Sequence, residues 1–181
     1  MRHVRGYSLI ELLVALSMSS LLMLSVSSLM ITLHQQVVAE LKQAQLLIQA
    51  NRINEYLVAE IKRAGFAVSQ SASVVGNQLA IHYKLGECSE CQYQGLLIFE
   101  EDNKLKVCNR LSANPISLTQ VCEQSIKFSM LSDKLIVVES FIVSEVTSRL
   151  YSIDYALRLK GDTQLEEFSL LASARGADGA E

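Results

Sequence analysis

An apolar run near the N-terminus constrains this chain more than any other feature. The run extends over 27 residues, from Tyr7 to Leu33, and Glu11 is its one charged residue. As a helix it would be about 40 Å long, enough to cross a bilayer core of about 30 Å with some tilt. A carboxylate in such a segment costs on the order of a few kcal/mol, so we expect Glu11 to have a function there.

A short basic leader precedes the run and indicates its orientation. Arg2 and Arg5 lie in this leader, and positive residues beside a hydrophobic segment stay on the cytoplasmic side. Two general explanations are open. A cleaved secretory signal has an apolar region of only about 7–15 residues, shorter than this one. An uncleaved signal anchor would need no particular residue at Gly6 or Glu11.

The residues around the start of the run resemble a known signature. Gly6 is followed by Tyr7-Ser8-Leu9-Ile10-Glu11, which resembles the type IV prepilin motif shared by pilins and type II secretion pseudopilins. The resemblance implies that prepilin peptidase cleaves between Gly6 and Tyr7 and methylates the new amine of Tyr7. Tyr7 stands where the family usually has Phe. Glu11 becomes the fifth residue of the mature chain, and the family pairs this glutamate with the N-terminal amine of a neighbouring subunit.

Electrostatics agrees with that implied role. Cleavage would create an ammonium group on Tyr7, about one helical turn from Glu11. An unpaired buried charge is costly, whereas a paired one is tolerable. Cleavage therefore supplies the group that makes a carboxylate in the membrane acceptable.

After the run the chain stays helical in pattern but becomes polar, with two apolar stripes. The spacing places the stripes on nearly opposite faces, so we expect the first to face neighbouring helices and the second to pack on a globular domain; a kink near Leu46 to Ala50 is the alternative. Lys62, Arg63 and Gly65 suit a helix end. The first stripe is Val37, Leu41, Ala44 and Ile48, and the second is Leu46, Ala50, Ile53, Leu57, Ile61 and Ala64.

Beyond Gly65 the pattern changes to short β runs and turns. Hairpins are expected around residues 76–77 and 101–103, and two further β runs, 126–131 and 135–140, flank residues 132–134. Residues 150–160 alternate clearly and are expected to pair antiparallel with residues 164–173. The predicted fold class is α+β, a long N-terminal helix packed on an antiparallel β-sheet head, as in pilins.

These patterns divide the chain into five parts. We predict a leader at residues 1–6, a transmembrane half of the helix at 7–33, a periplasmic amphipathic half at 34–65, a β-rich head at 66–174 and a tail at 175–181. The stretch Ile61 to Phe66 resembles the end of the long helix in minor pilins of the PilW or prepilin-peptidase-dependent protein B type.

The four cysteines, Cys88, Cys91, Cys108 and Cys122, all follow the apolar run. In an exported head an even number favours disulfides, and we prefer the pairs Cys88–Cys91 and Cys108–Cys122. A redox site at Cys88 and Cys91 would need a thioredoxin-like βαβ context, which the pattern lacks. A zinc site would need closer spacing of the second pair.

No catalytic set, metal site or cofactor motif emerges, so we expect no enzyme and no cofactor. The net charge of −3 gives no support to nucleic-acid binding.

We expect the protein to be a minor pilin that helps to initiate type IV pilus assembly. Its partners would be prepilin peptidase, other minor and major pilins, the inner-membrane assembly platform and membrane lipid. The protein would cross the inner membrane once, with its head in the periplasm, and then enter a pilus near the tip. A minor pseudopilin of the GspJ kind and a signal-anchored periplasmic redox protein are the alternatives.

Overall fold

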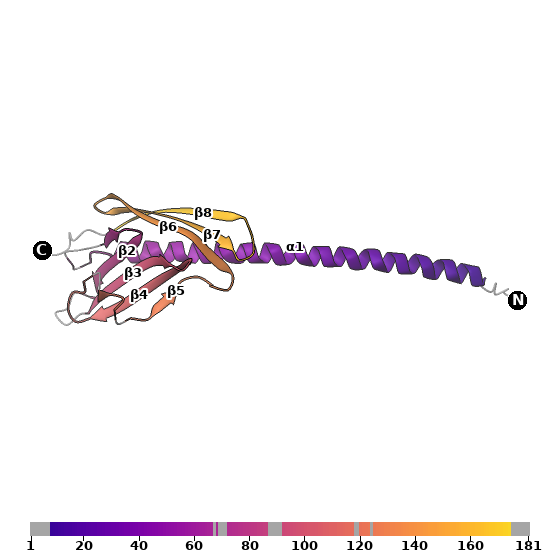
Figure 1. The fold of residues 1–181 in the computed structure, drawn as a ribbon, viewed down its shortest axis with the longest axis horizontal. Coiled ribbons are helices and arrows are strands. Elements are labelled where there is room, and N and C mark those ends of the chain that lie inside the picture. The colour runs from indigo at the N-terminus through magenta and orange to yellow at the C-terminus, as the bar shows by residue number, and fades with distance from the viewer. Residues whose placement is uncertain are drawn as a thin grey trace. The chain divides into compact units, whose positions relative to one another are not determined.

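The computed structural model describes residues 8–66, 68, 72–86, 92–117, 120–123 and 125–174. Its elements are one helix followed by strands (Figure 1): α1 (Leu9–Arg63), β1 (Ala72–Val75), β2 (Gln78–Lys84), β3 (Tyr93–Glu101), β4 (Lys104–Ser112), β5 (Lys127–Ser129), β6 (Ile136–Thr147), β7 (Leu150–Leu159) and β8 (Leu165–Ser173). The chain divides into two compact units, residues 1–43 and 44–181. The predicted α+β class, with one long helix and antiparallel sheets, is confirmed.

The described residues of the second unit form two antiparallel sheets, whereas the sequence predicts one. Strands β1 to β5 form a five-stranded sheet in sequence order, and β6 to β8 form a three-stranded sheet. One hydrophobic core joins the α1 residues of this unit to both sheets. Its members include Leu57 on the helix, Ile98 on the first sheet and Ile153 on the second, none of which is accessible to solvent. Burial of this apolar surface is the main force that holds the unit together.

The helical stripes behave as their spacing predicts. All six residues of the second stripe, from Leu46 to Ala64, are buried, whereas the four residues of the first stripe are exposed. The chain remains helical through Leu46 to Ala50. Gly65, with φ +84°, follows the last turn, and its N–H donates to the carbonyl of His82. This bond ties the end of α1 to β2.

Two of the expected turns are present. Val75 pairs with Gln78 around Gly76 and Asn77, and β3 and β4 meet at a turn in which Asp102 and Asn103 both have positive φ. Two consecutive positive φ values fit the right-handed twist of the flanking strands. The late hairpin is also present. Strands β7 and β8 pair antiparallel, from Leu150 opposite Ser173 to Arg158 opposite Leu165.

The two β runs that flank residues 132–134 belong to different sheets. In the first sheet β5 pairs with β4, and in the second β6 pairs with β7. The run beginning at residue 135 is also longer than expected and continues to Thr147. Its pairing register shifts between Val138 and Ser140, so Val138 and Phe141 are both buried although they are three positions apart, an odd number. A β-bulge breaks the period-two pattern in this way.

Candidate membrane and assembly site

The side chain of Glu11 caps the N-terminus of α1. The backbone N–H of Ser8 donates to Glu11 Oε2 at 3.1 Å, three residues along. This is the side-chain-to-backbone half of a capping box, in which the residue at the third helical position satisfies a free N–H. A negative charge at this end also lies favourably in the helix dipole. Glu11 therefore has a local acceptor role in addition to the pairing expected of it.

That local role was missed from the sequence, although the pattern Ser8-x-x-Glu11 before an apolar run is its signal. Gly6 and Tyr7, the expected cleavage site, lie outside the described residues, so their roles stay predictions. The mature chain would begin one residue before Ser8. The new amine would thus start close to the backbone group that Glu11 already contacts.

The surface of α1 in the first unit is apolar and exposed to its surroundings. Every large aliphatic side chain from Leu9 to Leu33 is at least 48% exposed. By length and composition α1 can cross a membrane, and it is the one such helix among the described residues. This helix indicates membrane anchoring.

The serines of this segment do not conflict with a lipid environment. Each hydroxyl donates to a carbonyl three or four residues earlier in the same helix, as Ser17 does to Val14 at 2.8 Å and Ser19 to Ala15 at 2.7 Å. The same bond is made by Ser20, Ser25, Ser27 and Ser28. A hydroxyl that is bonded within its own helix avoids most of the cost of burial in hydrocarbon. The serines thus need no partner helix to satisfy them.

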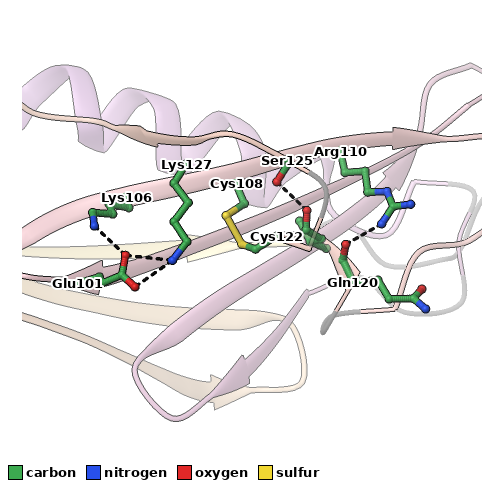
Figure 2. Close-up of a disulfide and its surroundings, with 9 residues drawn as sticks. Glu101, Lys106, Cys108, Arg110, Gln120, Cys122, Ser125 and Lys127 are labelled. Atoms are coloured by element: carbon green, nitrogen blue, oxygen red, sulfur yellow. Dashed lines mark hydrogen bonds and ion pairs between the residues drawn. A yellow bond between two sulfur atoms is a disulfide. The ribbon is translucent and has the colours of Figure 1, made fainter.

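A disulfide fastens the connection between β4 and β5 to the first sheet (Figure 2). Cys108 on β4 is bonded to Cys122, with Cα atoms 5.3 Å apart, which is the pairing preferred for these two residues. Beside it, Arg110 donates to the carbonyl of Gln120 at 2.8 Å. Cys108 and Val121 are buried in a small cluster with Phe99. Cys88 and Cys91 lie outside the described residues, so their pairing stays a prediction.

A partly exposed charge cluster lies on the face of the first sheet that carries Cys108. Figure 2 shows the Glu101 carboxylate between Lys106 at 2.7 Å and Lys127 at 2.9 Å. Hydrogen bonds from these two ammonium groups lower the pKa of Glu101 to about 2. Through Lys127, Glu101 links the β3–β4 turn to β5.

A buried polar group ties α1 to the first sheet. Glu60 is buried, and its carboxylate accepts hydrogen bonds from Tyr83 on β2 at 2.8 Å and from Arg63 at 3.0 Å. Burial raises the pKa of Tyr83, and the hydrogen bond to Glu60 raises it further. The tyrosine therefore stays a donor over the physiological range. Within the described part of the chain, no group of three or more His, Cys, Asp or Glu could hold a metal ion.

Comparison with known proteins supports the N-terminal assignment. Residues 1–27 match the family model described as the prokaryotic N-terminal methylation motif. No curated protein and no solved structure matches the chain. The motif, the exposed apolar helix and the antiparallel sheets together support a type IV prepilin-like protein. The motif also implies processing by prepilin peptidase and pilin-type interactions.

Proposed function

We propose that this protein is a minor pilin, cleaved between Gly6 and Tyr7 and methylated on Tyr7, that helps other minor pilins to initiate a type IV pilus. The observation that carries the proposal is the methylation motif at the start of an apolar run, Tyr7 to Leu33, whose one carboxylate is Glu11. In this role the protein is an assembly subunit and not an enzyme. Its expected partners are prepilin peptidase, other minor and major pilins and the inner-membrane assembly platform.

The two halves of α1 have separate roles in this proposal: the first inserts into the membrane, and the second contacts other subunits during assembly. The segment before residue 34 anchors the protein in the inner membrane, with the head in the periplasm. The exposed first stripe, which includes Val37, Leu41 and Ile48, is left for contact with helices of other subunits. Entry of the helix into the filament brings Glu11 to the amine of a neighbouring subunit. The pairing neutralises both charges and fixes the axial register.

Two substitutions of Glu11 separate its charge from its capping role. Glu11→Gln keeps an acceptor that can cap Ser8 but removes the charge, whereas Glu11→Ala removes both. If charge pairing drives assembly, both variants lose incorporation into pili while the membrane-inserted protein remains. Glu40→Gln, an exposed carboxylate on the same helix, is the control and should assemble normally. Normal assembly of Glu11→Gln with loss in Glu11→Ala would show that the cap matters and would refute charge pairing.

A minor pseudopilin of type II secretion, of the GspJ kind, is the second candidate, because the same motif serves both systems. Deletion of the gene distinguishes them. Loss of surface pili with normal protein secretion supports the pilus assignment, and the reverse result supports the pseudopilus. A signal-anchored redox protein acting through Cys88 and Cys91 would instead retain its function after Glu11 is replaced.

A further inference from the structure

The second unit contains an open pocket of about 340 Å³ between α1 and the edge of the first sheet. Its apolar wall is made by Ile53 on the helix, Val107 on β4, Phe128 on β5 and Met130 just beyond β5. Phe128 is 55% exposed, although its strand is paired with β4. An aromatic ring held in this way is available to a side chain that enters the pocket. We name this site the α1–β4 pocket.

The apolar surface continues past the pocket along the same two strands. Leu111, near the end of β4, is 51% exposed, and Ile126, directly before β5, is 73% exposed. Leu111 shares a face of β4 with Val107 and Asn109 because side chains alternate along a strand. A small ligand in the pocket would leave these residues uncovered. A peptide segment that runs along the strands could cover them as well.

Each of the described polar residues that line the pocket, Arg52, Tyr56 and Asn109, offers at least one hydrogen-bond donor. Arg52 lines the pocket, and we find no ion pair or hydrogen bond for it within the described part of the chain. Tyr56 also lines it; burial and the nearby Glu60 raise its pKa to about 12, so its hydroxyl stays protonated. The side-chain oxygen of Asn109 accepts from Gln94, which leaves the Asn109 NH₂ group as a donor. None of the described residues that line the pocket carries a carboxylate.

We propose that the α1–β4 pocket binds an extended segment of a partner protein, which inserts an apolar side chain and places a neighbouring carboxylate on Arg52. The apolar wall fits the inserted side chain, and the Arg52 guanidinium, which has no partner among the described residues, supplies the complementary charge. A planar guanidinium is well suited to a carboxylate. That the partner is another pilin-like subunit rests on the proposed function, whereas the chemistry of the pocket does not.

A short tryptophan peptide tests the proposal directly, because the chain itself contains no tryptophan. The full chain in detergent micelles is titrated with the peptides acetyl-Ser-Thr-Trp-Glu-Thr-Ser-amide and its Gln counterpart. Peptide fluorescence is measured against empty micelles. We expect a saturable blue shift, with binding of the Glu peptide about fivefold tighter than that of the Gln peptide. The preference should disappear in Arg52→Gln.

Two further variants locate the binding site. Phe128→Ser should abolish the blue shift, and Leu171→Ser, at an exposed leucine on β8, should preserve it. The proposal is overturned if no saturable binding occurs up to about 1 mM, the weakest affinity worth assigning to a site. Equal binding to Phe128→Ser, or equal binding of a Lys peptide, would also overturn it. Indole-3-propionate that binds as tightly as the Glu peptide would show a site for small carboxylates and refute a peptide segment. None of these outcomes depends on Glu11 or on pilus assembly.

Discussion

Two adjacent leucines on α1 should differ sharply in their contribution to stability. Leu46 is 1% exposed and belongs to the core, whereas Leu47 is 41% exposed. Leu46→Ala removes three buried carbon atoms, worth about 2.4 kcal/mol at about 0.8 kcal/mol each, and leaves a cavity that adds to the loss. We expect Leu46→Ala to lower the free energy of unfolding by about 3 kcal/mol. Leu47→Ala should lower it by less than about 1 kcal/mol, because no cavity forms.

Urea unfolding of the detergent-solubilised protein measures this difference, followed by the near-ultraviolet signal of the head tyrosines. With a slope of about 1.5 kcal/mol per molar urea, Leu46→Ala should move the midpoint down by about 2 M. The slope should not change, since the same surface is exposed on unfolding. Equal midpoints for the two variants would refute the assignment of the second stripe to the core. A larger shift for Leu47→Ala would refute it as well.

Three other predictions concern the head. Replacing both Cys108 and Cys122 by Ser should lower the free energy of unfolding by about 3 kcal/mol, since the bridge joins residues 14 positions apart; unchanged urea midpoints would contradict this. Tyr83→Phe should cost about 1.5–3 kcal/mol, because buried Glu60 loses a hydrogen bond at 2.8 Å, and thermal unfolding tests it. Because the pKa of Glu101 is lowered in the folded state, the stabilisation of the fold by its ion pairs is complete above about pH 4.5 and is lost as the pH falls toward about 2. Carboxyl chemical shifts measured by NMR should therefore show a midpoint near 2, and a midpoint near 4.5 would contradict the ion pairs with the lysines.

The sequence predicted the helix and its two stripes because local periodicity determines both. The buried residues Leu57 and Ile61 and the exposed residue Leu41 lie on the faces that the spacing assigned to them. The end of the helix was also predictable, since Gly65 tolerates the positive φ that ends the last turn. These features depend on neighbours within one or two turns.

The division of the strands into two sheets could not be predicted from such local patterns. Whether the β runs that flank residues 132–134 pair with each other or join separate sheets depends on the contacts of β5 with β4 and of β6 with β7. The bulge near Glu139 also disrupted the alternation that reveals a strand. The pattern therefore predicts a strand that ends at residue 140, whereas β6 has 12 residues and continues to Thr147.

The candidate site shows the same contrast. Glu11 and the motif around it were evident from residue types, but its cap on Ser8 required the helix start to be located. The α1–β4 pocket could not be predicted, because Arg52 and Phe128 come together only when the helix packs on the sheet edge. Of the four cysteines, Cys108 and Cys122 are joined, and their Cα separation of 5.3 Å shows how the fold brings distant residues into bonding range.

The mature N-terminus is the most direct test of a prepilin-like protein. The full chain is expressed in a host that contains prepilin peptidase, purified from its inner membrane and analysed by mass spectrometry of its N-terminal peptide. A chain that begins with N-methylated Tyr7, and that begins at Met1 when the peptidase is deleted, is the expected result. A chain that begins at Met1 in the presence of active peptidase, or one cut after the apolar run, would contradict the account.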